Sequence, residues 1–277
     1  MHAKITLPAL TRMKREGRKI VGVVAWDFHM AQLADRAGAD IVSVGDTVGV
    51  NLWGHANPLE VTMDEMLVVC RAVRRGVRRA LLSCDFPFGP LQEGPDSAVR
   101  AAIRLVKEAG VDVVKLDGAA DHLEAVQAVT HAGIPVFAQF GITPQTALAY
   151  GVEYSATPSA DSQVPVEMRD ELVSQAKQLE AAGAVLLNFT NSGPVVGPAV
   201  VESVSVPVLG GFGGGPWLDG RIRMAHAAIG YAATAVDDPP DTYANVARIT
   251  LDALSAYADD VRSGRQIKGG IPVPPAT

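Results

Sequence analysis

Two apolar segments of the sequence each end on an aspartate. Residues 41–47, IVSVGDT, reach Asp46, and residues 81–89, LLSCDFPFG, reach Asp85. If both carboxylates lie at one apolar-walled mouth, they lose water and repel each other, so keeping both ionised requires a cation. Carboxylates of this kind are the oxygen ligands that Mg²⁺ prefers. Taken singly, each aspartate has a plainer interpretation as the cap of the next helix or turn.

Further polar residues follow other apolar segments. Lys115 and Asp117 stand in VKLDG, Gln139 in AQFG, and Asn188 and Thr190 in LLNFTN. A lysine at such a place can pair with a substrate carboxylate. A 2-oxo acid chelates Mg²⁺ through its keto and carboxylate oxygens, and the metal then stabilises the enolate formed when a proton leaves the adjacent carbon. Together these residues predict metal-assisted enolate chemistry on a small-molecule 2-oxo acid.

A helix-to-strand junction recurs four times in the chain. The phrases AGADIVSVGD, AGVDVVKLDG, AGIPVFAQFG and AGAVLLNFT place Gly38, Gly110, Gly133 and Gly183 where a helix closes on a left-handed glycine. The strands that follow are nearly continuous apolar runs, which is typical of parallel strands buried on both faces. The repeated unit therefore predicts a parallel sheet of βα units.

The number of strands favours a closed barrel. Seven are expected, at residues 20–25, 41–47, 79–84, 111–116, 134–139, 184–189 and 206–211, and a weaker eighth at 228–234. This predicts a (β/α)8 TIM barrel, with an open doubly wound sheet as the alternative. We expect a single domain over residues 1–277, with a short N-terminal helical segment and a C-terminal tail. Strand carboxyl ends in such a barrel meet at the mouth where barrel enzymes keep their chemistry.

Two connections are longer than a barrel needs. Residues 46–62 and 140–166 both follow strand ends, and we expect the second to cover the active site. A decorative or partly helical insertion is the alternative for the second. His55, in the first connection, is a candidate substrate contact or a turn residue.

Composition narrows the function classes. The net charge is −6 and the basic residues are scattered, which argues against nucleic acid as a partner. The sequence contains no run of about eighteen apolar residues, which is the length needed to span a bilayer, and the N-terminus does not resemble a signal peptide. The two cysteines, Cys70 and Cys84, form no CxxC pair and fit a reducing compartment. We therefore expect a cytoplasmic protein that binds neither nucleic acid nor membrane.

Eight motifs stand in order along roughly residues 5–265: AWDFHMAQLADRAGADIVSVGDTVG, WGHANPLEVT, CDFPFG, VKLDG, FGITPQ, AAGAVLL, VPVLGGFGGG and DGR. In content and order they resemble the ketopantoate hydroxymethyltransferase family of the phosphoenolpyruvate mutase and isocitrate lyase superfamily. The resemblance implies a (β/α)8 barrel and a homo-oligomer. It also implies Mg²⁺-dependent transfer of a hydroxymethyl group from 5,10-methylenetetrahydrofolate to 3-methyl-2-oxobutanoate.

The resemblance also implies roles for individual residues. Asp46 and Asp85 would be metal ligands, and Asp85 would also lie against the substrate. Asp117 would stand where a glutamate of the family organises metal-bound water, and is expected in the metal site. Thr47 and Lys115 would hold the substrate carboxylate or keto oxygen.

Three features depart from the family pattern. Thr190 stands where the family has its general-base glutamate, and a hydroxyl is too weak a base for that task without an activator. Gln139 replaces a histidine, and the KVQGR segment of the family is not recognisable in residues 140–166. Four residues are candidates to take over the proton transfer: Asp117, His55, Glu153 and Asp161.

Several alternatives follow from these departures. The protein could be a diverged 2-oxo-acid aldolase or lyase, or a non-catalytic barrel subunit. Against the last, a pure scaffold has no physical need for two repelling carboxylates beside a lysine. The glycine-rich residues 210–216, GGFGGGP, could bind phosphate, although the motif order explains them as a strand-end turn.

Overall fold

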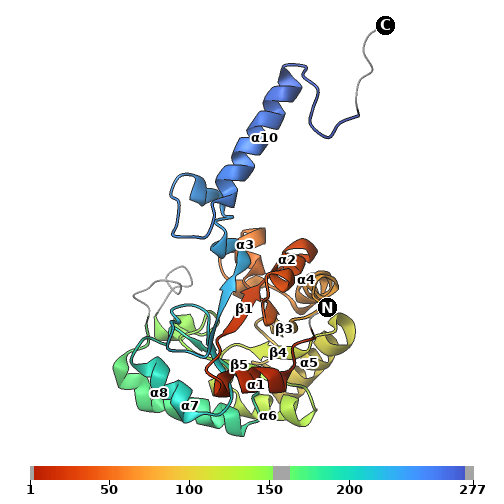
Figure 1. Cartoon of the computed structure of the whole chain (residues 1–277). Helices are drawn as coiled ribbons and strands as arrows, with labels where there is room; N and C mark the ends of the chain where they lie inside the picture. Colours follow the sequence, from red (N-terminus) through yellow and green to blue (C-terminus); the bar gives the residue numbers. More distant parts are fainter. Residues whose placement is uncertain (1–2, 152–162, 272–277) are drawn as a thin grey trace. The chain divides into compact units, whose positions relative to one another are not determined.

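Eight parallel strands form a closed barrel in the order of the sequence; Figure 1 labels β1, β3, β4 and β5 among them. They are β1 (Ile20–Val24), β2 (Ile41–Val44), β3 (Leu81–Asp85), β4 (Val113–Leu116), β5 (Val136–Gly141), β6 (Leu186–Thr190), β7 (Val208–Gly210) and β8 (Gly220–Met224). The predicted (β/α)8 barrel is therefore confirmed, and the open sheet is excluded.

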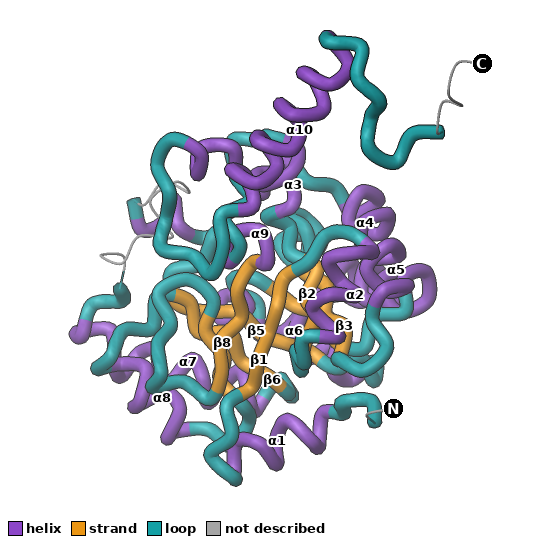
Figure 2. Tube along the Cα trace, turned by 45° about the horizontal axis from the view of Figure 1, so that its top comes forward, coloured by secondary structure: helices purple, strands orange, loops and turns teal. Residues whose placement is uncertain are grey.

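Helices follow the strands, and the purple helices surround the orange strands in Figure 2. This computed structural model describes residues 3–151 and 163–271. The helices up to β8 are α1 (Leu7–Arg15), α2 (Phe28–Arg36), α3 (Val48–Trp53), α4 (Met63–Gly76), α5 (Pro95–Ala109), α6 (Leu123–His131), α7 (Arg169–Ala181) and α8 (Val196–Ser203). Short 3-10 turns are η1 (Pro58–Glu60), η2 (Ala119–Asp121), η3 (Ala147–Tyr150) and η5 (Val166–Met168).

Local signals explain where the helices begin and end. The Asp27 side chain caps α2 by accepting a hydrogen bond from the Met30 backbone N–H at 2.9 Å. Thr62 and Glu65 form a reciprocal capping box at the start of α4. All four junction glycines have positive φ, as predicted, from 66° at Gly110 to 96° at Gly183.

One end of the barrel interior is apolar. The inward side chains there are Ile20, Ile41, Leu81, Val113, Phe137, Leu186, Leu209 and Ile222, and Leu10 and Met13 of α1 pack against them. Side chains alternate along a strand, so residues two positions further on face inward as well. Five of those eight positions are polar and buried: Ser43, Ser83, Lys115, Gln139 and Asn188. The barrel thus changes from an apolar base to a polar interior toward its carboxyl-end mouth.

The eighth strand lies at Gly220–Met224, so its predicted place at 228–234 is wrong. Residues 228–234 contain instead the end of α9 (Ala225–Ala228), a turn, and the start of η6 (Ala233–Val236). Our prediction looked for continuous apolar residues, as in strands buried on both faces. Strand β8 alternates, because its outer side chains Arg221 and Arg223 are exposed while Ile222 is buried.

The two long connections differ in how much of them the structure describes. Residues 46–62 contain α3 and η1. Of residues 140–166, the first belong to β5, and Ala147–Tyr150 form η3. Residues 152–162 lie outside the described part, and with them the proposed bases Glu153 and Asp161. The expectation that this connection covers the active site stays a prediction.

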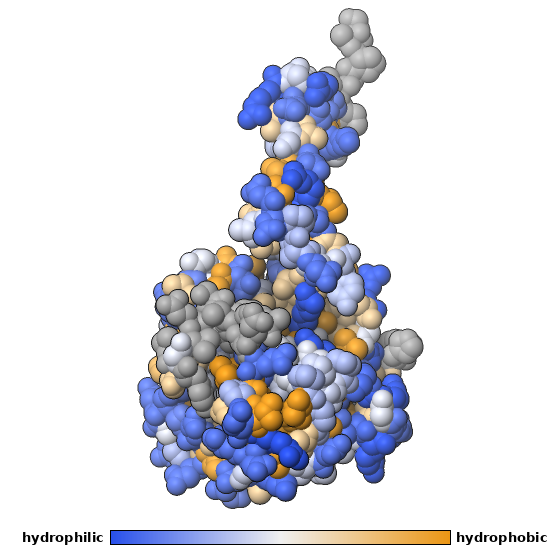
Figure 3. Space-filling model, turned by 90° about the vertical axis from the view of Figure 1, so that its left-hand side faces the viewer, coloured by the Kyte–Doolittle hydropathy of each residue, from blue (hydrophilic) through white to orange (hydrophobic). Residues whose placement is uncertain are grey.

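The chain consists of two compact units, Met1–Arg223 and Met224–Thr277. The second contains α9, η6 and α10 (Val246–Arg262). Within it, the Asn245 side chain donates a hydrogen bond to the Ala235 carbonyl at 2.9 Å and also caps α10. Among the described helices we find none with the length and apolar composition needed to cross a membrane. The face in Figure 3 is mostly hydrophilic, with scattered apolar side chains, as is usual for protein surfaces.

Candidate active site

Four charged side chains gather at the carboxyl ends of β2, β3 and β4. Asp46 follows β2 by two residues, Asp85 ends β3, and Asp117 directly follows β4, which carries Lys115. These strands are neighbours in the barrel, and Asp85 pairs in register with Lys115. All four residues are at most 7% exposed. Three carboxylates and one ammonium group are therefore held together away from water.

Lys115 and Asp85 form a buried ion pair. The Lys115 Nζ donates a hydrogen bond to Asp85 Oδ2 at 2.8 Å. Burial alone would lower the pKa of Lys115, but the charges of Asp85, Asp117 and Asp46 outweigh it and raise that pKa. The lysine is therefore cationic, and it balances one of the three carboxylates.

A chain of two side-chain amides, on β5 and β6, leads to Asp117. Gln139 on β5 donates to Asp117 Oδ2 at 3.3 Å, and Asn188 on β6 donates to Gln139 Oε1 at 3.0 Å. The Gly211 backbone N–H donates in turn to Asn188 Oδ1 at 3.2 Å. This chain of hydrogen bonds orients Gln139 so that it presents its N–H group to the carboxylate.

Gln145 joins the site, although our sequence analysis did not single it out. Its Nε2 donates to Asp46 Oδ2 at 2.8 Å and to the Phe86 carbonyl oxygen at 3.1 Å. Its backbone N–H lies 3.4 Å from Asp117 Oδ2. The FGITPQ motif contained this residue, but nothing in the local pattern shows that its side chain returns to β2 and β3.

Several buried oxygen atoms of the site have no partner. Asp85 Oδ1, Asp117 Oδ1 and Thr190 Oγ1 make no hydrogen bond within residues 3–151 and 163–271. An unpaired buried carboxylate oxygen costs free energy unless a ligand satisfies it. No three His, Cys, Asp or Glu side chains of the described part are grouped closely enough to hold a metal ion. The site fits a hard cation held by one or two carboxylates, with water or substrate oxygens completing its shell, as is usual for Mg²⁺.

The carboxylates have raised pKa values. Burial, followed by the charges of Asp85 and Asp117, raises the pKa of Asp46 to about 8. Burial raises the pKa of Asp117 to about 6, although Lys115 works against the rise. It also raises the pKa of Asp85, again opposed by Lys115. Without a metal cation, these carboxyl groups therefore keep their protons to a higher pH than exposed aspartates do.

These shifts predict a pH-dependent stability for the protein without divalent metal. Raised folded-state pKa values mean that the native state binds more protons than the unfolded chain above about pH 4. The resulting stabilisation is complete below that pH and is lost as pH rises through about 6 for Asp117 and about 8 for Asp46. We expect the melting temperature in EDTA to fall between pH 5 and pH 8, and Mg²⁺ to raise it most at pH 8.

Differential scanning fluorimetry with EDTA or Mg²⁺ tests this expectation. An Asp46→Asn variant is the control, because its melting temperature in EDTA should fall less between pH 6 and pH 8. Equal pH profiles of the parent and this variant in EDTA would contradict the assignment.

The remaining predicted residues lie in different surroundings. Thr47 is buried directly after Asp46, and Thr190 is buried at the end of β6, opposite Gly141 in the strand register. His55 packs against Trp53, with ring centroids 5.7 Å apart, and its ring lies beside Gly49. None of the contacts of His55 with described residues reaches the three carboxylates. Thr47 thus directly follows Asp46, and the described contacts of His55 are with Trp53 and Gly49.

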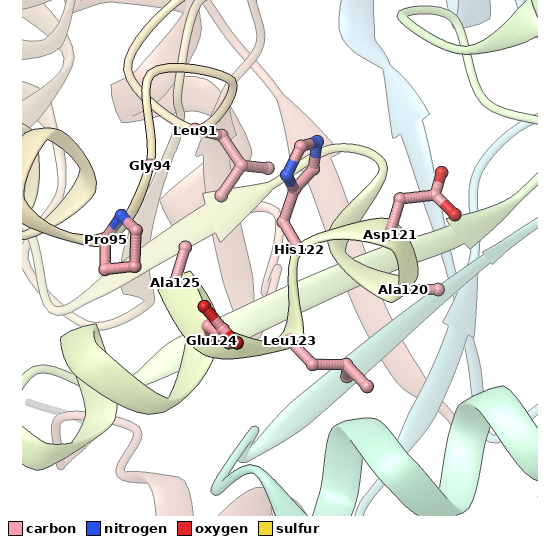
Figure 4. A pocket seen from close by; sticks show the side chains of 9 residues that line it. All are labelled: Leu91, Gly94, Pro95, Ala120, Asp121, His122, Leu123, Glu124 and Ala125. Atoms are coloured by element: carbon pink, nitrogen blue, oxygen red, sulfur yellow. The ribbon is translucent and has the colours of Figure 1, made fainter.

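A cavity of about 490 Å³ lies elsewhere, between the starts of α5 and α6. It is lined by Leu91, Gly94, Pro95, Ala120, Asp121, His122, Leu123, Glu124 and Ala125. In Figure 4 the His122 ring points toward Leu91, while the Asp121 carboxylate points away from it. No predicted site residue lines this cavity, so it is distinct from the carboxylate site.

Comparison with known proteins identifies the relatives of the chain. The family model described as ketopantoate hydroxymethyltransferase matches residues 4–266. A 3-methyl-2-oxobutanoate hydroxymethyltransferase of Cyanothece sp. is 38% identical over 264 residues, which cover 94% of this chain and 97% of the relative. The enzyme of that name from Pyrococcus abyssi is also 38% identical, over 95% of this chain and 89% of the relative.

Solved structures with the same fold are more distant in sequence. Oxaloacetate acetylhydrolase has a TM-score of 0.61 at 13% identity, covering 96% of this chain and 99% of that one. A 2,3-dimethylmalate lyase of the phosphoenolpyruvate mutase and isocitrate lyase superfamily has a TM-score of 0.59 at 14% identity, over 93% and 98%. Phosphonopyruvate hydrolase, solved with oxalate and Mg²⁺, has a TM-score of 0.57 at 17% identity, over 97% and 92%. These likenesses support the barrel fold.

Proposed function

The chain belongs to the ketopantoate hydroxymethyltransferase family, and on that premise we propose that it forms a carbon–carbon bond at C3 of a 2-oxo acid in an aldol-type transfer. Its relatives carry the name of a transferase acting on 3-methyl-2-oxobutanoate. The observation that carries the proposal is the buried pair of strand-end carboxylates, Asp46 and Asp85, beside Lys115. A barrel without chemistry has no physical need for this arrangement.

Mg²⁺ is the cation that this site fits, and Asp46 and Asp85 would hold it. When bound, it would supply a Lewis acid that stabilises negative charge on the keto oxygen of the substrate. Lys115 would hold the substrate carboxylate, because its ammonium group remains charged in the buried site. Thr47, next to Asp46, would add a hydroxyl to the same substrate group.

Asp117 is the residue that would move the proton from C3. Threonine at position 190 cannot do so, because a hydroxyl without an activator is too weak a base. Among the four candidate bases, Asp117 lies in the carboxylate site with its Oδ1 buried and unpartnered among described residues. The described contacts of His55 are with Trp53 and Gly49, and Glu153 and Asp161 are outside the described part. The Gln139 amide would keep Asp117 oriented toward the mouth.

The proposal also concerns which molecule donates the one-carbon unit to the 2-oxo acid. 5,10-Methylenetetrahydrofolate is the donor that the family resemblance implies. Thr190 favours a second candidate function, in which the same enolate chemistry joins or cleaves a 2-oxo acid with another aldehyde. Both functions share an enolate at C3, which forms when the C3 proton leaves before bond formation and takes up a proton there after cleavage. Exchange of the C3 proton is therefore the first step to test.

Proton NMR in D2O tests the shared step. We expect Mg²⁺-dependent loss of the C3 proton signal from at least one of 3-methyl-2-oxobutanoate, 2-oxobutanoate, pyruvate and oxaloacetate. The best exchanger would then be offered to the enzyme with 5,10-methylenetetrahydrofolate or with free aldehydes. EDTA should stop the exchange. Absence of exchange with all four acids, while Mg²⁺ binds, would favour a different reaction or a non-catalytic barrel.

A further inference from the structure

Gln145 connects the Asp46 carboxylate to the backbone carbonyl of Phe86, the residue after Asp85. We propose that it is a positioning residue, which sets the orientation of Asp46 and its separation from Asp85 before the cation binds. The inference rests on the proposed function, since it requires a cation at these carboxylates. It assigns a role to a residue that contacts a proposed metal ligand.

The first argument for this role is the pattern of hydrogen bonds to the three carboxylates. Each carboxylate has one oxygen held by a side-chain N–H donor, namely Lys115 for Asp85, Gln139 for Asp117 and Gln145 for Asp46. In all three cases the held atom is Oδ2. Since one oxygen is fixed, the other has a defined direction. The unpartnered Oδ1 atoms of Asp85 and Asp117 are consistent with oxygens reserved for a ligand.

The second argument is the geometry of the Gln145 carboxamide. A carboxamide NH2 group has two N–H donors, and Gln145 directs them to Asp46 Oδ2 at 2.8 Å and to the Phe86 carbonyl at 3.1 Å. Phe86 directly follows Asp85, so one NH2 group clamps the end of β2 to the end of β3. The clamp therefore limits how far the two carboxylates can separate under their mutual repulsion.

The third argument is that the donor, Gln145, has no charge. A lysine or arginine at position 145 would also hold Asp46, but its positive charge would repel the incoming cation. A glutamine donates hydrogen bonds and leaves the negative charge of the carboxylates intact. Groups of this kind that orient metal ligands typically change metal affinity by about 10- to 100-fold when they are removed. Gln145 has the chemistry and the contacts of such a group.

Metal binding measured without substrate tests the inference. Gln145→Met keeps the length of the side chain and removes both donors. We expect its Kd for Mn²⁺, measured by electron paramagnetic resonance, to rise about tenfold or more. The Mg²⁺ concentration that half-saturates proton exchange should rise in parallel, while the exchange rate at saturating Mg²⁺ changes less. A residue that only supports the fold would lower the melting temperature without this split.

Two further variants complete the test. Thr146→Val is the matched control, because it removes the hydroxyl that bonds Thr143 in the same turn and leaves the donors to Asp46 in place. Its Kd for Mn²⁺ should stay within about twofold of the parent value. Gln145→Asn keeps the amide but is one methylene shorter, so it should also weaken Mn²⁺ binding, and it serves if Gln145→Met does not fold.

The outcomes separate the inference from the proposed function. Unchanged Mn²⁺ affinity in Gln145→Met, with exchange and metal binding intact in the parent, would overturn the inference alone. A parent protein that binds no Mn²⁺ and exchanges no proton would overturn both.

Discussion

An Asp85→Asn variant should lose Mg²⁺-dependent exchange of the C3 proton by about a thousandfold. Removing one electrostatic group that stabilises developing charge costs about 10² to 10³ in rate. Asp85 would contribute more than one such effect, because it is both a proposed metal ligand and the partner of Lys115 at 2.8 Å. With asparagine at this position, the lysine would also lose the carboxylate that holds it in place for the substrate.

The same substitution should affect stability as well as rate. Removing one partner of a buried ion pair typically costs about 3–5 kcal/mol, because the other charge remains buried. The loss here should lie at the lower end, since Asp117 and Asp46 also stabilise the Lys115 charge. Urea unfolding of the variant in EDTA measures this term separately from the exchange rate.

Asp112→Asn is the matched control for Asp85→Asn. Asp112 directly precedes β4, at the opposite end of the strand from Asp117, and forms ion pairs with Lys4 and Arg74. It also accepts a hydrogen bond from the Leu82 backbone N–H at 2.9 Å. This variant should lose stability and keep its exchange rate. If Asp85→Asn retained exchange within about tenfold of the parent, Asp85 would have no part in the chemistry.

The architecture could be predicted from the sequence because burial on both faces leaves a strong pattern. The first seven strands are mostly apolar, and each junction glycine marks where a helix returns to the sheet. Strand β8 was misplaced because exposed Arg221 and Arg223 interrupt that pattern. A continuous apolar pattern identifies only strands that are buried on both faces. A strand with an exposed outer face contains polar residues and therefore resembles a loop in the sequence.

Some features of the site could also be predicted from the sequence, and others could not. The gathering of Asp46, Asp85 and Lys115 could be anticipated, because parallel neighbouring strands bring their carboxyl ends together. The role of Gln145 could not, since its contacts depend on how the chain after β5 returns over β2 and β3. Nor does the sequence indicate that Gln139 orients Asp117, because a polar residue on a barrel strand is equally compatible with substrate contact.

Replacing Thr190 with glutamate should raise the rate of C3 proton exchange by about a hundredfold. A positioned general base contributes about 10² to 10⁴ in rate, and the family resemblance places a glutamate at this position. Thr190 lies at the end of β6 with its Oγ1 buried and without a partner in the described part of the chain. A carboxylate there would share the site with Asp117, so the exchange rate should rise with pH as the new group ionises.

Thr190→Gln separates the base from the bulk of the new side chain. The glutamine side chain has nearly the same size as glutamate and can donate and accept hydrogen bonds, but it cannot take up a proton near neutral pH. We expect exchange in Thr190→Gln to stay at or below the parent rate, so that a gain confined to the glutamate variant identifies base catalysis. An equal gain in both variants would point to improved substrate packing. A folded Thr190→Glu protein without any gain would mean that this position no longer faces the reacting carbon, and that the site has been rebuilt around Asp117.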